Sequence, residues 1–389
     1  MTFSLGNSDL QQLRVRHQIS KSNGKQPRIL MTIDAVGGVW RYAMDLATEL
    51  VEWGIETVFA GFGPPPSERQ LREVSGKRIV IWTDAPLDWT TDREERLDEV
   101  PDLLANLVAS NGIDIVHLNL PSQGAGLDVD VPVVVMSHSC VVTWFRAVRN
   151  SAPPADWVWQ KQRNRSGFDR ADIVLSPSES HAEALRLNYG QIPNLQVVHN
   201  SSRAPLCSLP KEDFVFAAGR WWDEGKNGAV LDLAAPCLTW PLVMAGASFG
   251  PNGQQCTIIN AKHVEHLAHE ETMALMSRAA IVASPSLYEP FGLVPLEAAR
   301  CGAALVLADI PTYRELWDGA ALFADPRDPR AFADAINRLT SDAKLRIDLA
   351  RLAQKRSSTF SPGAQAGEMA EIYTRLTRGF TAPQHWSLA

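Results

Sequence analysis

Short apolar runs alternate with amphipathic stretches along most of the chain. Residues 28–33 form a mainly apolar run, residues 39–53 repeat apolar positions with helical spacing, and a second apolar run follows at 56–60. Strands buried on both faces are apolar throughout, and their alternation with helices predicts a parallel sheet. The alternation continues with strands expected at 78–82, 114–118, 131–137, 172–175 and 195–199 and helices at 93–110 and 178–188.

Residues 200–211 interrupt this pattern with Ser, Pro and Arg that show no periodicity, which is typical of a linker. The alternation then restarts, with strands expected at 214–218, 240–245, 279–284 and 303–308 and helices at 227–235, 270–278, 293–301, 328–339, 342–356 and 364–379. Two consecutive halves of this kind predict two doubly wound, Rossmann-like α/β domains that face each other across a cleft. Ligands of such sheets bind beyond the carboxyl ends of the strands.

The length of 389 residues also favours two domains. We divide the chain into a flexible tail at 1–27, an N-terminal domain at 28–202 and a C-terminal domain at 203–361. The last helical segment, at 362–389, is expected to return to the N-terminal domain.

The composition narrows the function classes. The formal net charge of −7 argues against a general electrostatic affinity for nucleic acid. The chain has no apolar run of bilayer length and no signal-peptide pattern at its start, so we expect a cytoplasmic protein. The five cysteines are scattered without metal-ligand spacing and are expected to be reduced thiols: Cys140, Cys207, Cys237, Cys256 and Cys301.

The most informative stretch covers residues 284–302. A turn follows the expected strand 279–284, and a helix is expected to start near Leu293. The free amides at its start then lie at the carboxyl edge of the sheet, where they can bind a phosphate or a hydroxyl. Glu289 precedes this helix and Glu297 lies within it. Because two carboxylates would repel a bare anion, the expected ligand carries hydroxyl groups as well as phosphate.

This stretch resembles the signature of the retaining glycosyltransferases of family 4, which include bacterial glycogen synthase and sucrose synthase. The signature is Glu289, the turn Phe291-Gly292-Leu293, and Glu297. The resemblance implies the two-domain GT-B fold. It also implies that the first acid and the following amides contact the donor sugar, while the second acid holds the ribose hydroxyls. An ordinary turn between a strand and a helix is the alternative explanation.

A second element of the same family follows the first strand of the C-terminal half. Gly219-Arg220 ends this strand and Lys226 comes in the next loop, one residue further along than is usual, with Trp221 where leucine is common. The resemblance implies that Arg220 and Lys226 neutralise the diphosphate of the donor. The alternative is that they are solvated loop charges.

Five residues of the N-terminal half are further candidates. Gly37 and Gly38 resemble the family's glycine loop, which lets the backbone approach the diphosphate. His138 ends a predicted strand, where several family members place a histidine next to the donor sugar; a histidine bonded within a turn explains it equally well. Trp40 and Trp144 are plausible residues of the acceptor site.

The resemblance implies transfer of a hexosyl group from a nucleoside-diphosphate sugar, with UDP the commonest choice and GDP and ADP open. The acceptor would be a glycan, a lipid-linked molecule or a small molecule. The family reacts by front-face attack with retention of configuration and needs no metal or other cofactor, so the pair Asp128 and Asp130 is interpreted as a polar loop. The expected catalytic residues are Glu289, Arg220, Lys226 and His138.

Residues 144–170 combine six basic side chains with three tryptophans. Contact with an anionic membrane surface, or with a lipid-linked or phosphorylated acceptor, is one explanation. A solvated helix with buried tryptophans is the other.

Three other functions stay open at this point. The chain could bind sugar nucleotides without catalysis, or it could be another GT-B enzyme, such as a sugar-nucleotide epimerase or a phosphorylase. A phosphorylase would need a lysine that carries pyridoxal phosphate, and no motif supports one.

Overall fold

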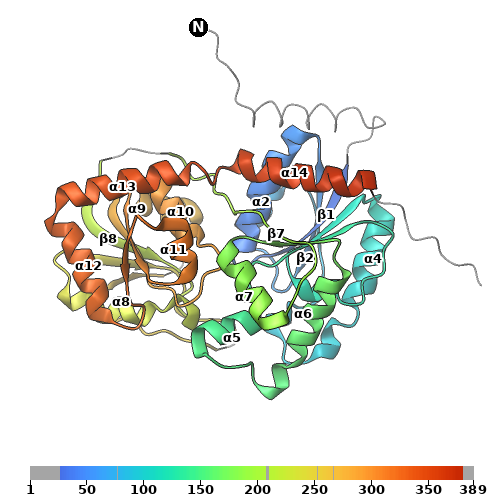
Figure 1. The fold of residues 1–389 in the computed structure, drawn as a ribbon, viewed down its shortest axis with the longest axis horizontal. Helices are drawn as coiled ribbons and strands as arrows, with labels where there is room; N and C mark the ends of the chain where they lie inside the picture. The colour runs from blue at the N-terminus through green and yellow to red at the C-terminus, as the bar shows by residue number, and fades with distance from the viewer. Residues whose placement is uncertain (1–26, 77, 207–209, 252, 266, 380–389) are drawn as a thin grey trace, which may run out of the picture.

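The computed structural model describes residues 27–76, 78–206, 210–251, 253–265 and 267–379. Two α/β domains lie side by side, each built around a parallel sheet with helices on its faces (Figure 1). The predicted GT-B architecture is confirmed. The tail expected at 1–27 falls almost entirely outside the described residues.

The N-terminal sheet has the strand order β3-β2-β1-β4-β5-β6-β7. Its strands are β1 (Arg28–Asp34), β2 (Glu56–Phe62), β3 (Ile79–Trp82), β4 (Ile115–Leu118), β5 (Val133–Met136), β6 (Ile173–Ser176) and β7 (Leu195–Val197). The order reverses direction between β1 and β4. Loops that leave neighbouring strands on either side of such a reversal diverge and form a crevice at the carboxyl edge.

The α-helices of this domain are α2 (Gly38–Leu50), α3 (Glu68–Val74), α4 (Val100–Asn111), α5 (Val141–Arg149), α6 (Trp159–Arg170) and α7 (Glu179–Tyr189). The helix expected at 93–110 is shorter than predicted, since α4 begins only at Val100. Pro101 lies in its first turn, where the missing N–H of proline costs no helical hydrogen bond.

The C-terminal sheet has the order β10-β9-β8-β11-β12-β13 and reverses between β8 and β11. Its strands are β8 (Glu212–Ala218), β9 (Leu242–Ala245), β10 (Lys262–Val264), β11 (Ala279–Ser284), β12 (Ala304–Ala308) and β13 (Leu322–Ala324). Its helices are α8 (Gly228–Ala234), α9 (His269–Arg278), α10 (Leu293–Arg300), α11 (Pro311–Trp317), α12 (Pro329–Ser341) and α13 (Ala343–Ser357). The edge strands β10 and β13 were not predicted, because three residues are too few to show a period.

The last described helix, α14 (Pro362–Gly379), crosses back to the N-terminal domain, as expected (Figure 1). Its buried face, including Met369 and Tyr373, belongs to the same hydrophobic core as α2. The Tyr373 hydroxyl lies 2.6 Å from Nδ1 of the fully buried His117 on β4. Burying such side chains stabilises the crossing by about 1.5–3 kcal/mol each. The helix therefore ties the end of the C-terminal domain to the N-terminal domain.

Candidate active site

The carboxyl edge of the C-terminal sheet brings together two of the predicted site residues. Lys226 lies in a short 3-10 turn after β8, and Glu289 lies in the loop that follows β11. The Lys226 ammonium forms an ion pair with the Glu289 carboxylate, which also accepts a hydrogen bond of 3.3 Å from Ser286 Oγ. Both charged side chains are largely shielded from solvent. The pair holds each side chain in place.

Arg220, directly after β8, reaches across to the N-terminal domain. Its Nη1 atom occupies the space beside Gly37, where an added Cβ would lie only 2.6 Å away. Asp34, at the end of β1, shapes this loop by accepting hydrogen bonds of 2.9 and 3.1 Å from the amides of Val36 and Gly37. Burial raises the pKa of Asp34, and the positive charge of Arg220 opposes that rise. The glycine loop and the predicted diphosphate arginine therefore face each other between the domains.

The start of α10 meets the same loop. Gly292 adopts a φ of 93°, and a Cβ there would lie 2.8 Å from Tyr313 Cε1, so glycine is required on both counts. Phe291 is buried in the C-terminal core, which fixes the turn. Leu293 begins the helix and lies opposite Gly38, whose added Cβ would be 3.5 Å from Leu293 Cδ1. The helix start thus lies at the junction of the two domains.

Glu297 lies further along α10 and has different neighbours. Glu297 is buried, with 7% of its surface exposed. Burial and the nearby Asp45 of α2 raise its pKa to about 7. Arg41 and a hydrogen bond with Ser202 of the linker act in the opposite direction. A cavity of about 280 Å³ is lined by other residues of this region: Arg41, Asp45, Ser202, Arg203, Ala204, Pro205, His269, Glu270 and Met273. Glu297 is thus in the interdomain region but belongs to a separate group from Lys226 and Glu289.

His138 follows β5 at the carboxyl edge of the N-terminal sheet. Its Nε2 atom lies 2.9 Å from Asn119 Oδ1, and its ring packs edge-on against Tyr42 at 4.3 Å. Burial lowers the pKa of His138 to about 3. The imidazole is therefore neutral near pH 7 and can offer a hydrogen bond but no charge.

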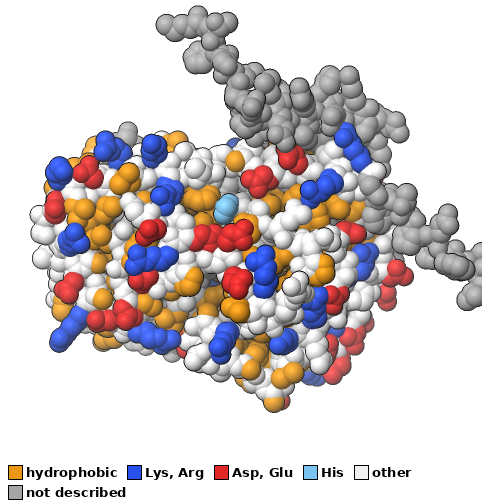
Figure 2. Space-filling view, viewed as in Figure 1, with side chains coloured by type: hydrophobic (Ala, Val, Ile, Leu, Met, Phe, Trp, Pro, Cys, Tyr) orange, Lys and Arg blue, Asp and Glu red, His pale blue; other side chains and the backbone are white. Residues whose placement is uncertain are grey.

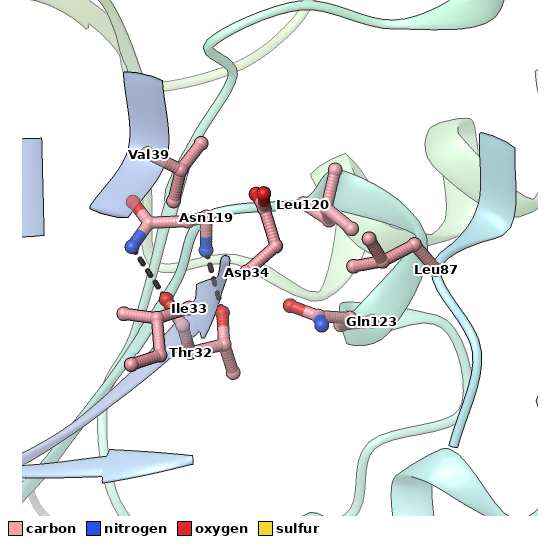
Figure 3. Close-up of a pocket in the computed structure, with 8 residues that line it drawn as sticks. All are labelled: Thr32, Ile33, Asp34, Val39, Leu87, Asn119, Leu120 and Gln123. Atoms are coloured by element: carbon pink, nitrogen blue, oxygen red, sulfur yellow. Dashed lines mark hydrogen bonds between the residues drawn. The ribbon is translucent and has the colours of Figure 1, made fainter. Parts of the chain in front are cut away.

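A small hollow lies beside these groups, at the ends of β1 and β4 (Figure 3). Asn119, which lines the hollow, donates a hydrogen bond of 2.6 Å from Nδ2 to the Thr32 carbonyl oxygen. The Asp34 carboxylate and the Gln123 amide also border it, and the buried Gln123 Oε1 has no hydrogen-bond partner among the described residues. Sequence reasoning missed these polar groups, although Asp34 stands at a strand end directly before the glycine loop.

Comparison with known proteins identifies the family. The model described as Glycosyltransferase Family 4 matches residues 36–201, and the model described as Glycosyl transferases group 1 matches residues 254–356. A D-inositol 3-phosphate glycosyltransferase from Corynebacterium glutamicum is 32% identical over 393 residues, which cover 87% of this chain and 91% of that enzyme. The chain belongs to the family 4 glycosyltransferases.

The other similarities cover less of the chain or have lower sequence identity. The glycogen synthase of Mycobacterium tuberculosis is 36% identical over 126 residues, and the matched part spans only 30% of that enzyme. Sucrose-phosphate synthase from Thermosynechococcus elongatus has a TM-score of 0.76 at 18% identity and covers 91% of this chain and 100% of its own. Anabaena HepE, solved in complex with UDP-glucose, has a TM-score of 0.70 at 18% identity and covers 90% of this chain and 100% of its own. These structures establish the shared fold.

The two tryptophans expected to line the acceptor site of the glycosyltransferase both form hydrogen bonds within the protein. Trp40 is 3% exposed in the N-terminal core, and its Nε1 donates a hydrogen bond of 3.0 Å to Glu73. Trp144 on α5 donates from Nε1 to Asp223 Oδ1 at 3.0 Å, across the domain boundary and beside Arg220. Helical periodicity shows that a tryptophan is on a buried face, but it does not show which neighbour that face meets.

Most basic side chains of residues 144–170 have partners inside the protein. Arg163 donates to the Leu97 carbonyl, Arg170 donates to two carbonyls of the segment between β4 and β5, and Arg165 pairs with Asp169. These contacts account for the basic side chains, so no membrane surface is needed to explain them. Among the described residues, no helix has the length and apolar character needed to cross a bilayer.

A further contact between the domains lies at the start of α7. The Glu315 carboxylate accepts hydrogen bonds from the amides of Glu179 and Ser180 at 2.9 and 2.7 Å. Burial raises its pKa, but the nearby His199 and the hydrogen bonds from Ser180 and Glu179 outweigh burial and lower the pKa to about 2. His199 lies 3.8 Å away. Carboxylates and a histidine gather where the domains meet on the face shown in Figure 2. Glu315 thus links the C-terminal domain to the start of α7.

Proposed function

We propose that this glycosyltransferase moves a hexosyl group from a UDP-sugar to a hydroxyl of a glycan, lipid-linked or small-molecule acceptor, with retention of configuration and without a metal. The observation that supports this most strongly is the arrangement of Arg220, the Lys226–Glu289 pair and the start of α10 along one domain boundary. A nucleoside diphosphate joined to a sugar carries the charges and hydroxyls that such a group can bind. HepE, of the same fold, was solved with UDP-glucose.

The donor would rearrange the ion pair. A diphosphate offers the Lys226 ammonium a more highly charged partner than Glu289, and the Arg220 guanidinium and the free amides at the start of α10 add further positive potential. Glu289 would then be released to accept hydrogen bonds from the sugar hydroxyls. Glu297, near Asp45 and Ser202, would hold the ribose hydroxyls.

In the reaction, the bond between the anomeric carbon and the diphosphate oxygen breaks while the acceptor oxygen bonds to the same face of that carbon. The acceptor proton passes to the departing diphosphate oxygen. Arg220 and Lys226 stabilise the negative charge that grows on the leaving group, and the two domains hold both substrates in place. The neutral His138 would contribute a hydrogen bond to the sugar.

The acceptor would bind on the N-terminal side, where Asp34, Asn119 and Gln123 present polar groups at the carboxyl edge of the sheet. Such groups bind hydroxyls. The relatives include a glycogen synthase and D-inositol 3-phosphate glycosyltransferases, so sugars and polyols are the first acceptors to test.

A thermal-shift panel of UDP, GDP and ADP, followed by a donor hydrolysis and transfer assay, tests the proposal. A ligand that binds only the folded protein raises the unfolding temperature by mass action. We expect UDP to give the largest shift and a UDP-sugar to be consumed. A shift without consumption of any donor would support a non-catalytic binding protein, and conversion to a free epimeric sugar would support an epimerase.

A further inference from the structure

Helix α5 of the N-terminal domain reaches two loops of the C-terminal domain. One loop carries Arg220 and Lys226, and the other carries Glu289. Thr143 Oγ1 lies 2.7 Å from the hydroxyl of Tyr288, next to Glu289. At the other end of the helix, Arg149 donates hydrogen bonds of 2.9 and 2.7 Å to Glu224. The Trp144 bond to Asp223 lies between these two contacts. One N-terminal helix therefore touches both loops of the proposed donor site.

Asp223 connects three groups. Its Oδ1 accepts hydrogen bonds from Trp144 Nε1 at 3.0 Å and from the Gly225 amide at 2.9 Å, and its Oδ2 lies 3.6 Å from Arg220 Nη2. The side chain is 15% exposed, so these interactions are partly protected from water. Gly225 makes room for the indole, because a Cβ there would lie 2.8 Å from Trp144 Nε1.

Arg220 needs such a support. Its side chain is 38% exposed, and its guanidinium lies 5.4 Å from the centre of the Trp222 ring. A long, half-exposed arginine has many rotamers, and ordering them costs free energy. A carboxylate beside Nη2 restricts these rotamers and directs Nη1 toward the glycine loop at Gly37.

We propose that Asp223 is a positioning residue for Arg220 and that Trp144 holds Asp223 in place when the domains close. The inference rests on the proposed function, in which Arg220 stabilises the leaving diphosphate. Because Trp144 belongs to one domain and Asp223 to the other, their hydrogen bond exists only in the closed arrangement. Domain closure therefore completes the arginine site, and transfer is coupled to the exclusion of water.

Two substitutions separate the role of Asp223 from that of Trp144. Asp223→Asn keeps an oxygen that can accept from Trp144 but removes the charge beside Arg220. Trp144→Phe keeps an aromatic ring against Gly225 but removes the N–H donor. Arg149→Gln is the matched control: it breaks another bond between α5 and the same loop and removes the guanidinium from over the Trp144 ring, but it leaves the Trp144–Asp223 hydrogen bond and the Asp223–Arg220 pair in place.

The measurements are kcat for transfer from a UDP-sugar, the Kd of UDP and the unfolding temperature. We expect kcat to fall about tenfold in Asp223→Asn and about fivefold in Trp144→Phe. These losses are of the size expected when a hydrogen bond to a charged group is removed. The Kd of UDP should change less than about twofold in Trp144→Phe and stay equal or decrease in Asp223→Asn, because a negative charge near the diphosphate is removed. Arg149→Gln should stay within about twofold, as expected of an exposed ion pair.

Two results would overturn the inference. One is a kcat in both variants equal to that of Arg149→Gln. The other is a parallel loss of kcat, UDP affinity and unfolding temperature, which marks a merely structural role. Arg220→Ala, assayed beside them, separates the two proposals: an active Arg220→Ala enzyme contradicts the proposed function, whereas an inactive one with unaffected Asp223→Asn and Trp144→Phe contradicts only the positioning role.

Discussion

The two halves of the candidate site are built differently. The C-terminal half presents charges, with Arg220 directed at the glycine loop and Lys226 paired with Glu289. The N-terminal half presents buried and mostly neutral polar groups, with His138 bonded to Asn119 and uncharged near pH 7. A site for a charged donor and a site for hydroxyl groups need these different chemistries. Under the proposed function, the donor is held by electrostatic attraction and the acceptor by hydrogen bonds.

Removal of the arginine tests the charged half most severely. Arg220→Ala should lower kcat for transfer by about a hundredfold or more, because the diphosphate loses a positive partner while negative charge grows on it as it leaves. The unfolding temperature should change little, since the side chain is half-exposed. Steady-state kinetics with a UDP-sugar measure the loss, and near wild-type turnover would remove the distinction between the two halves.

Glu297 is the acid of the C-terminal half that resembles the buried N-terminal groups. Its pKa is raised to about 7 by burial, above the ordinary value of 4.5, so the folded protein holds this proton where the unfolded chain has lost it. That contribution to stability is present at low pH and is lost as the pH rises through about 7. Between pH 5 and 8, the free energy of unfolding of the wild type should fall about 2 kcal/mol more than that of Glu297→Gln.

Urea unfolding of both proteins across this range measures the difference. Equal pH dependence in the two would show that Glu297 ionises normally, and it would return this residue to the charged half of the site.

The contact between the halves can be disturbed through the glycine loop. In Gly37→Ala the new Cβ would displace the Arg220 guanidinium, whereas the backbone φ of −134° suits alanine. We expect kcat to fall about tenfold with an unchanged unfolding temperature, because the end of a flexible side chain can move. Gly38→Ala should lower kcat less than Gly37→Ala does, since its Cβ would contact Leu293 at an ordinary van der Waals distance of 3.5 Å. Equal effects of the two substitutions would show that Arg220 does not act at Gly37.

The smallest kinetic effect is expected in the N-terminal core. Trp40→Phe removes the hydrogen bond to Glu73 and should lower the free energy of unfolding by about 1 kcal/mol. The KM of the acceptor should change less than about twofold, because the indole is buried away from solvent. A large rise in this KM with unchanged stability would restore Trp40 as a residue of the acceptor site.

The expected approach of Gly37 and Arg220 to one diphosphate came from the family resemblance, whereas local pattern was enough to predict the sheets and the turn and helix around Glu289. These features depend on residues close in sequence, at strand ends whose edge is known once the sheet is parallel. The partners of Trp40, Trp144 and Glu297 could not be predicted, because each depends on how segments more than 30 residues apart pack together. Asp223 was missed for the same reason, since its role appears only when α5 lies across it.

The central claim is that the domain boundary around Arg220, Lys226 and α10 binds a nucleoside diphosphate through its phosphates. Calorimetric titration of the wild type and Arg220→Ala with UDP and with uridine tests it most directly. We predict that the wild type binds UDP at least about a hundredfold more tightly than uridine and that Arg220→Ala loses most of this ratio while its uridine affinity stays the same. Equal affinities of the wild type for UDP and uridine, or an unchanged ratio in the variant, would contradict the account.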